Sequence, residues 1–336
     1  MIAIFGAGPA GSSAAIAARR CGVAVRLLER DRSAAFKAGE SLAPVARAWL
    51  RRLGVWEQFS GDGHRTCVGN ASAWGSDTLQ RTDFLFGVHG PGWHLDRRRF
   101  DDRLRQTAIE AGAVRADDPG DAAWCIDCTG RASLVARQRG AKRLVRDSLL
   151  SHVALLEACD DEAFTLVEAR PDGWWYTAVI PGGRRVLAYQ TEAGSESDGL
   201  ARSRDGFQAL LAGTSHVRER GLGEWVSGPA VQPAGTSRLD RFAGPGWVAA
   251  GDAAYALDPL SSHGIVHAMQ SGWAAGMAVA AQLQGDASAM SSYENQLDQE
   301  FHTYLELRTS YYLLEQRWQE NFFWRRNRVA FGEDKW

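Results

Sequence analysis

Near its N-terminus the chain reads IAIFGAGPAGSSAAIAARRCGVAVRLLER, from Ile2 to Arg30, and this stretch decides the fold. A short apolar run ends at Gly6, an alanine-rich segment begins at Pro9, and a second apolar run ends at Glu29. Strand, turn, helix and strand in this order are typical of two parallel strands joined by a crossover helix. The stretch therefore predicts the first unit of a Rossmann-like α/β domain.

Three glycines of this stretch form the pattern GxGxxG. The first glycine permits a tight turn, the second lets backbone approach a pyrophosphate, and the third lets helix and strand pack closely. Backbone N–H groups at the helix start would bind phosphates, and an acidic residue after the second strand would accept hydrogen bonds from ribose hydroxyls. We therefore expect a dinucleotide cofactor bound by Gly6, Gly8, Pro9, Ala10, Gly11, Glu29 and Arg30.

The composition narrows the class of protein. With 336 residues the chain is long for one compact core, and a net charge of −2 offers no basic field for nucleic acid. No apolar run approaches the roughly 20 residues that span a bilayer, and no secretion signal precedes the first strand, so we expect a cytoplasmic protein. Cys125 and Cys128 form a CxxC without a second pair nearby, which favours a buried strand pair over a metal site.

Two later segments identify the dinucleotide. CIDCTGR (Cys125–Arg131) ends an apolar strand, and GWVAAGDAA (Gly246–Ala254) leads through Asp258 and Pro259 into a second helix. Together with GxGxxG, these segments resemble the FAD-dependent monooxygenases that share the glutathione-reductase-type nucleotide domain. That group includes the hydroxybenzoate hydroxylase type, the geranylgeranyl reductases and the tryptophan halogenases. The resemblance implies FAD as the cofactor.

The resemblance also implies where further residues lie around FAD. The aspartate of the GD motif would contact ribityl or ribose oxygens, and the loop after it would run beside the isoalloxazine. The helix that follows would direct its first N–H groups at the flavin pyrimidine, where a helix N-terminus stabilises the negative charge of reduced flavin. The GES segment and an arginine of HLDRRRFDDRL would also approach the flavin. These positions are Ser41, Arg97, Asp252, Pro259, Gly264 and Ile265.

The domain organisation follows from the same resemblance. We expect residues 1–65, 95–150 and 236–285 to form a discontinuous FAD-binding domain of the glutathione-reductase type. Residues 66–94 and 151–235 are expected to form an inserted antiparallel β-sheet that serves as the substrate domain, and residues 286–336 to form C-terminal helices. Four strands are predicted in the larger insertion from their apolar and β-branched runs, which are HVALLEA, FTLVEAR, WWYTAVIP and RRVLAYQT.

Two elements that the resemblance to halogenases calls for are missing. One is an active-site lysine beyond the GES segment, and the other is a WxWxIP motif. The lysines of the chain are Lys37, Lys142 and Lys335, so none lies between Glu40 and Arg99. The stretch YTAVIP keeps only the Ile-Pro pair. The sequence therefore argues against halogenation.

The stretches GWWYTAVIP (Gly173–Pro181) and DPLSSHG (Asp258–Gly264) are most similar to LodB/GoxB-like flavoproteins. These proteins mature quinone-cofactor oxidases by oxygenating a tryptophan of the partner enzyme. The resemblance implies an FAD-dependent monooxygenase that hydroxylates an indole through the flavin C4a-hydroperoxide. Its substrate and partner would be a precursor protein or peptide, with NAD(P)H or a flavin reductase as electron source. A flavin enzyme for small natural products (a halogenase or a geranylgeranyl-type reductase) and a non-catalytic FAD-binding assembly factor stay open as alternatives.

Candidate catalytic residues follow from residue type and place. Glu40 and His263 flank the expected flavin and carry groups that transfer protons. An indole substrate needs apolar walls, and Trp175 is the aromatic residue that we expect to act there. Further candidate walls are Trp74, Trp93, Trp174 and Tyr176.

Overall fold

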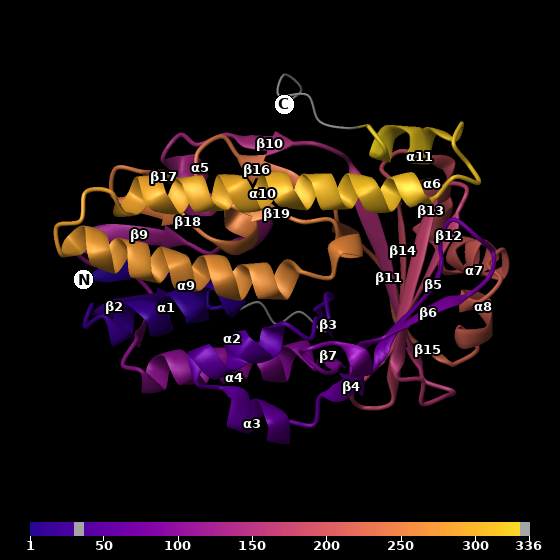
Figure 1. Ribbon diagram of the computed structural model, residues 1–336, viewed down its shortest axis with the longest axis horizontal. Coiled ribbons are helices and arrows are strands. Elements are labelled where there is room, and N and C mark those ends of the chain that lie inside the picture. Colours follow the sequence, from indigo (N-terminus) through magenta and orange to yellow (C-terminus); the bar gives the residue numbers. More distant parts are fainter. Residues whose placement is uncertain (30–36, 330–336) are drawn as a thin grey trace.

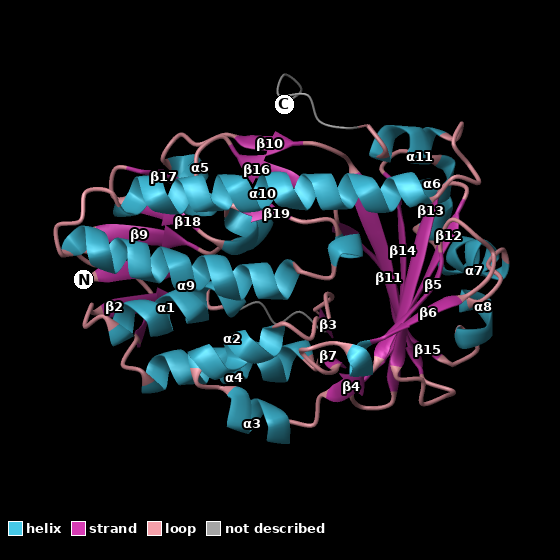
Figure 2. Cartoon of the chain, viewed as in Figure 1, coloured by secondary structure: helices cyan, strands magenta, loops and turns pink. Residues whose placement is uncertain are grey.

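A computed structural model describes residues 1–29 and 37–329, and it confirms an α/β architecture around the N-terminal stretch (Figures 1 and 2). Its first sheet has six strands, in the spatial order β17 (Ala243–Gly244), β18 (Trp247–Ala249), β9 (Trp124–Asp127), β1 (Ile2–Phe5), β2 (Val25–Leu28) and β8 (Val114–Ala116). Strand β1 pairs in parallel with β9 and β2, as predicted for the Rossmann-like unit. The edge pair β17–β18 is antiparallel.

Helices α1 (Pro9–Arg20) and α9 (Gly264–Leu283) pack on this sheet. Beyond them lie α2 (Ala46–Leu53), α3 (Trp56–Gly61) and α4 (Arg97–Glu110), of which α2 contacts α9 and α4 contacts α1. Helices α1 and α9 lie side by side because glycines of α9 face the backbone of α1 (Figure 1). A Cβ atom on Gly272 would lie 2.1 Å from the carbonyl oxygen of Ala10, and one on Gly276 would lie 2.4 Å from that of Ala14. The close approach fixes the start of α9 next to the glycine-rich turn.

A small antiparallel sheet and several short elements complete this part of the chain. The sheet contains β10 (Arg143–Val145), β16 (Ser237–Leu239) and β19 (Tyr255–Ala256). Around it lie α5 (Leu134–Gln138) and the 3₁₀ turns η2 (Gly130–Ala132), η3 (Gly251–Ala253) and η4 (Pro259–Ser261). The turns η2 and η3 follow the carboxyl ends of β9 and β18, which is where open α/β sheets bind ligands.

A seven-stranded sheet stands beside the Rossmann-like part (Figure 2). Its spatial order is β15 (Trp225–Pro233), β11 (Leu149–Glu157), β14 (Arg184–Glu192), β13 (Gly173–Ile180), β12 (Phe164–Arg170), β5 (Gly69–Ala73) and β6 (Gln80–Asp83). The four strands predicted in the larger insertion are confirmed as β11 to β14. The expected purely antiparallel pairing is wrong at one place, because β12 and β5 run parallel. The two strands come from separate segments and are not joined by a hairpin, so their relative direction is free.

One face of the seven-stranded sheet is covered by α6 (Glu196–Ala201), α7 (Arg204–Ala212) and α8 (Val217–Arg220). A second three-stranded sheet, of β3 (Ser41–Leu42), β7 (Gly92–His94) and β4 (Arg65–Cys67), lies between the two large sheets (Figure 1). In it, a strand from the first expected FAD-binding segment pairs with a strand from the first insertion. The division into domains at residues 65, 95, 150 and 236 stays a proposal.

The C-terminal region is helical, with α10 (Ala289–Leu314) and α11 (Phe322–Asn327). Helix α10 runs from the Rossmann-like part to the seven-stranded sheet (Figure 1). Across residues 1–29 and 37–329, no helix combines the length and apolar character needed to cross a bilayer. The same residues hold no group of three or more His, Cys, Asp or Glu side chains placed to bind a metal ion.

Candidate functional site

The glycine-rich turn between β1 and α1 has the geometry of a phosphate cradle. Gly6 has a φ of +102°, and a Cβ atom there would lie 2.3 Å from the carbonyl oxygen of Cys128. A Cβ on Gly11 would lie 1.7 Å from the carbonyl oxygen of Gly6. Gly8 differs, because its nearest non-neighbouring atom, Lys37 Nζ, would be 4.0 Å from a Cβ. Gly6 and Gly11 are therefore required for packing, whereas Gly8 borders open space that a pyrophosphate fits.

The start of α1 supports the same use. Among the described residues, no side chain caps the helix, and Pro9 stands in its first turn. Pro9 and Ala10 are buried against the turn. The helix N-terminus therefore offers backbone N–H groups and a positive dipole end to an anion.

Glu29 directly follows β2, where the ribose hydroxyls of a dinucleotide would lie. Its carboxylate accepts hydrogen bonds from Arg105 of α4, with both oxygens 2.7 Å from Nη1. The side chain keeps about a quarter of its surface exposed, so it can still accept hydroxyl donors. The sequence did not reveal Arg105 as a partner. Arg30, the neighbouring predicted contact, lies outside the described residues.

Arg97 lies at the start of α4 and contacts the segment before Glu40. Its guanidinium donates to the carbonyl oxygens of Ala38 at 3.0 Å and Gly39 at 2.7 Å, and it pairs with Asp101. Asp101 also pairs with Lys37. Arg97 therefore positions the GES segment, and its expected direct contact with FAD stays a prediction.

The GD motif forms the turn η3 after β18. Asp252 is partly exposed, and its Oδ2 lies 3.7 Å from Nε of Arg131 in η2. The predicted contacts Gly264 and Ile265 begin α9, in which Gly264 is exposed and Ile265 is buried. Pro259 is exposed in η4. The expected flavin contacts thus follow one another along the edge beyond β18.

Asp258, in the loop that precedes α9, is held by helix α10. Its carboxylate is fully buried and lies 3.0 Å from Nε of Arg308 and 2.8 Å from the hydroxyl of Tyr312. Its backbone N–H donates to the hydroxyl of Tyr304. Burial raises the pKa of Asp258, although the guanidinium of Arg308 opposes that shift. The sequence did not point to Arg308, Tyr312 or Tyr304, which fix the loop beside the start of α9.

Glu40 is a buried carboxyl at the junction of the sheets. It is 3% exposed, and its Oε2 has no hydrogen-bond partner within the described part of the chain. Burial raises the pKa of Glu40, while a hydrogen bond with Tyr176 and the charge of Arg97 lower it to a smaller extent. The Tyr176 hydroxyl also lies 2.7 Å from Oγ of Ser41. This cluster, Glu40–Ser41–Tyr176, joins the GES segment to strand β13.

Alternation along β13 separates its three aromatic residues. Trp174 packs with Tyr312 and Trp324 on the face toward α10 and α11, and Tyr176 packs on that face beside Ala38. Trp175 points the other way and is stacked on Tyr189 beneath α7, with 4.8 Å between ring centroids. This geometry argues against the expected role of Trp175 in the site, since successive side chains of a strand face opposite sides.

The remaining predicted side chains, those of His263, Trp74 and Trp93, lie in different surroundings. His263 is exposed directly before α9. Trp74 packs edge-on against Trp174 and donates from its indole nitrogen to the carbonyl oxygen of Tyr311 in α10. Trp93 is buried among aromatic residues beside α3. Of the candidate walls, Trp74, Trp174 and Tyr176 therefore share one face.

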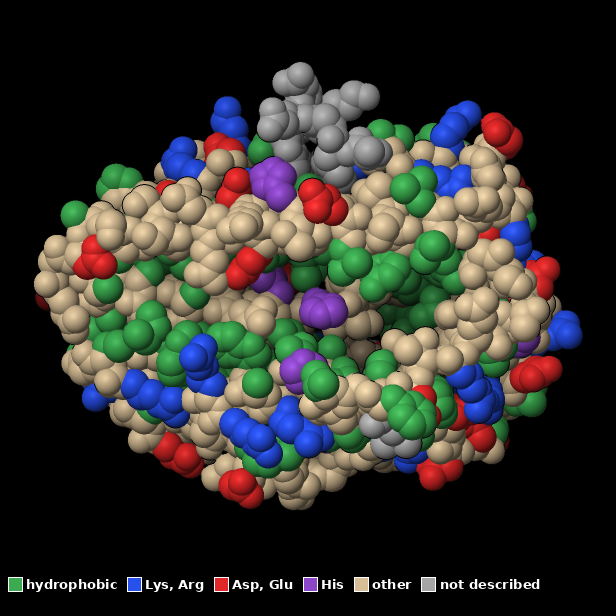
Figure 3. Space-filling model, viewed as in Figure 1, with side chains coloured by type: hydrophobic (Ala, Val, Ile, Leu, Met, Phe, Trp, Pro, Cys, Tyr) green, Lys and Arg blue, Asp and Glu red, His purple; other side chains and the backbone are tan. Residues whose placement is uncertain are grey.

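Figure 3 shows a hollow between the C-terminal half of α10 and the strands of the seven-stranded sheet, with hydrophobic side chains along it and histidine near its edge. In this half of α10, Leu307, Tyr311 and Leu314 are exposed. Their spacing of four and three residues places them on one side of the helix. Helix α10, which borders the hollow, thus carries an apolar side that the described part of the chain leaves partly exposed.

Comparison with known proteins agrees with this geometry. The sequence pattern of the tryptophan halogenase family matches residues 67–334, which is more than half of the chain. LodB, an FAD-dependent oxidoreductase of Marinomonas mediterranea, is 25% identical over 98% of this chain and 96% of its own length. A pyrrole-carbonyl carrier-protein brominase of Pseudoalteromonas luteoviolacea is 24% identical over 85% of this chain and 78% of its own length.

Solved structures show the same fold. The flavin-dependent halogenase CmlS superposes with a TM-score of 0.87 at 20% identity, covering 99% of this chain and 68% of its own. QhpG, a peptidyl tryptophan dihydroxylase essential for tryptophylquinone cofactor biogenesis, superposes with a TM-score of 0.81 at 24% identity, covering 97% of this chain and 78% of its own. Because the family pattern matches more than half of the chain, the chain belongs to the tryptophan halogenase family.

Proposed function

We propose that this FAD-dependent oxidoreductase is a monooxygenase that adds oxygen to the indole of a tryptophan side chain in a precursor protein or peptide. The observation that carries the proposal is the Glu40–Ser41–Tyr176 cluster, in a chain without a lysine between Glu40 and Arg99. The cluster provides a buried carboxyl beside the expected flavin, while the chain lacks the amine that a halogenase would need beyond the GES segment. Likeness to LodB and QhpG supports the same class of reaction.

FAD, when bound, supplies the chemistry that activates O2, and the protein supplies position and proton transfer. Gly8 and the N-terminus of α1 would bind the pyrophosphate, and Glu29 the ribose. Asp252 and the start of α9 would hold the flavin end. The residues present therefore fit the cofactor.

Glu40 is suited to the proton transfer that aromatic hydroxylation requires. When an indole carbon gains oxygen, it must lose its own proton to restore the aromatic ring. A carboxylate whose pKa is raised by burial accepts a proton more readily than an exposed one does. Tyr176 contacts this carboxyl. The partly buried Trp74, which packs edge-on against the buried Trp174, would offer an apolar wall on the same face.

The apolar face of α10 favours a polypeptide substrate over a small one. Leu307, Tyr311 and Leu314 are exposed on one side of α10, the helix that borders the hollow of Figure 3, and flanking residues of a precursor could pack on them. Binding energy from such remote contacts can be used to position the reacting indole. Free tryptophan lacks these contacts, so we expect it to be a poor substrate.

Halogenation is the second candidate function, because the chain belongs to the tryptophan halogenase family and resembles a brominase. Lys37 would then have to serve as the amine. Its ammonium pairs with Asp101 and lies next to Gly8, on the phosphate side of the site. This position favours a role in binding the cofactor.

The test is to incubate the reduced, FAD-loaded enzyme with a candidate precursor under O2 and halide, and to measure the masses of its tryptic peptides. A gain of one or two oxygens on a single tryptophan supports the proposal. A halogenated peptide, or turnover of free tryptophan or an isoprenoid with an unchanged precursor, overturns it.

A further inference from the structure

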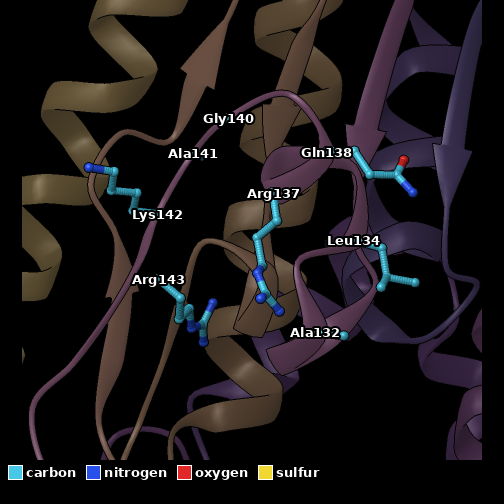
Figure 4. A pocket seen from close by; sticks show the side chains of 8 residues that line it. All are labelled: Ala132, Leu134, Arg137, Gln138, Gly140, Ala141, Lys142 and Arg143. Carbon is cyan, nitrogen blue, oxygen red and sulfur yellow. The ribbon is translucent and has the colours of Figure 1, made fainter.

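A pocket of about 690 Å³ opens beside α5, outside the glycine-rich turn (Figure 4). It is formed by the segment from η2 through α5 to the start of β10. Three of its lining residues are cationic, Arg137, Lys142 and Arg143, and none of its lining residues is acidic. The volume is in the range of pockets that bind small organic ligands.

The guanidinium of Arg143 is held by several hydrogen bonds, but one of its nitrogen donors has no acceptor among the described residues. Its Nη1 donates to Oγ of Ser133 at 2.8 Å and to the carbonyl oxygen of Ala253 at 3.0 Å, and its Nε donates to Oγ of Ser237. The remaining nitrogen, Nη2, is buried and has no partner among the described residues. Burial, together with repulsion from Arg131 and Arg137, lowers the pKa of Arg143 to about 10, even though Asp252 opposes the shift.

Arg137 is exposed and makes no hydrogen bond or ion pair with any described residue, and the same holds for the side chain of Lys142. Figure 4 shows the Arg137 and Arg143 side chains directed toward the same side of the pocket, near Ala132, whereas Lys142 extends away from them. The two guanidinium groups repel each other, and Asp252 compensates the charge of Arg143 only in part, so a shared oxyanion would stabilise the pair.

We propose that this pocket binds a phosphate group between Arg137 and Arg143. Guanidinium groups form paired hydrogen bonds with phosphate oxygens, and a dianion would neutralise both charges. The volume admits a ligand of nucleotide size, so the phosphate group belongs either to a nucleotide or to free phosphate. The site is separate from the predicted FAD pyrophosphate site, which lies at Gly8. The pocket is connected to the predicted FAD site through one hydrogen bond, because Arg143 donates to the carbonyl oxygen of Ala253, the residue after Asp252.

The experiment is calorimetric titration of the FAD-loaded protein at low salt with NADPH, NADH and inorganic phosphate. We expect a phosphate-bearing ligand to bind, and Arg137→Gln to weaken that binding about tenfold or more with FAD content unchanged. Arg139→Gln is the matched control, since Arg139 follows on the same turn but lies outside the pocket and contacts the carbonyl of Pro245. This control should bind like the wild type.

The ligands distinguish the two sources. Tighter binding of NADPH than of NADH and inorganic phosphate supports a nucleotide phosphate, and equal binding of NADPH and inorganic phosphate supports free phosphate. The proposal is overturned if none of the three binds, or if Arg139→Gln weakens binding as much as Arg137→Gln. Loss of FAD from Arg137→Gln would also overturn it, because the pocket would then belong to the FAD site. These results do not depend on the proposed tryptophan chemistry.

Discussion

The hydroxyl oxygens of Ser41 and Tyr176 lie 2.7 Å apart, and this hydrogen bond joins β3 to the central strand of the seven-stranded sheet. The same tyrosine contacts Glu40. The face of the sheet toward α10 and α11 is thereby joined to the segment that the family resemblance places beside the flavin. Substitutions that remove this hydrogen bond should therefore change the activity of the enzyme.

Tyr176→Phe removes the hydroxyl that holds Glu40 and Ser41 but keeps the ring. We expect about a tenfold loss of kcat with little change in melting temperature, because the site loses one positioning hydrogen bond. Trp175→Phe is the matched variant from the opposite face of β13, and it should keep kcat while losing about 1 to 3 kcal/mol of stability through a core cavity. Equal kcat losses in the two variants would show that the face assignment is wrong.

Glu40→Gln keeps the size of the side chain and removes its ability to accept a proton. We expect kcat to fall about 100-fold or more, as for the loss of a general base. Wild-type kcat should rise with pH through the raised pKa of Glu40, and the variant should lose this dependence. A variant that keeps the wild-type pH profile would assign the proton transfer to another group.

The same variant has an opposite effect on stability. Because burial raises the pKa of Glu40 in the folded chain, this carboxyl stabilises the fold below its ordinary value of 4.5 relative to higher pH, and that stability is lost as pH rises through the raised pKa. Glu40→Gln should therefore melt at a higher temperature than the wild type near neutral pH. The difference should shrink as the pH falls toward 4.5, which thermal melts at several pH values can measure.

Gly8→Val should give colourless protein. Its side chain would occupy the open space where a pyrophosphate fits, while the fold keeps the packing contacts of Gly6 and Gly11. Gly199→Ala is the control, because Gly199 is exposed and a Cβ there meets no atom within 4 Å. Visible absorbance after purification measures FAD content. Full FAD content in Gly8→Val would refute the placement of the cofactor.

Arg308→Met should destabilise the fold by about 3 to 5 kcal/mol, because it leaves buried carboxylates without their cation. Arg308 lies 3.0 Å from Asp258 and 3.3 Å from Asp147, and all three side chains are at most 4% exposed. Arg325→Met, on the exposed side of α11, should change stability little. Denaturant unfolding measures both. A small effect of Arg308→Met would mean that α10 does not anchor the loop at Asp258.

The fold and the identity of the cofactor could be predicted because their signals are local. Gly6, Gly8 and Gly11 lie within one turn, and the strand, the helix and Glu29 follow at short spacing. The partners of Asp258 could not be predicted in this way, since Arg308 lies 50 positions later in a helix with no matching motif. Arg105 was missed for the same reason.

The error at Trp175 has a different physical cause. Strand β13 is buried on both faces, so its sequence GWWYTAVI is apolar nearly throughout and shows no alternation. Sequence periodicity cannot assign faces in such a strand. Only its pairing with β12 and β14 and the positions of α7 and α10 determine that Trp174 and Tyr176 lie on the face toward α10 and that Trp175 lies on the opposite face.

The most direct test of the central claim is to trace the oxygen atom itself. The reduced, FAD-loaded enzyme is mixed with a candidate precursor under heavy-isotope O2, and the tryptic peptides are sequenced by mass spectrometry. We expect heavy oxygen on the indole of one tryptophan of the precursor, and none with Glu40→Gln in the same time. Heavy oxygen absent from the precursor while free tryptophan is labelled, or a halogen in its place, would contradict the account.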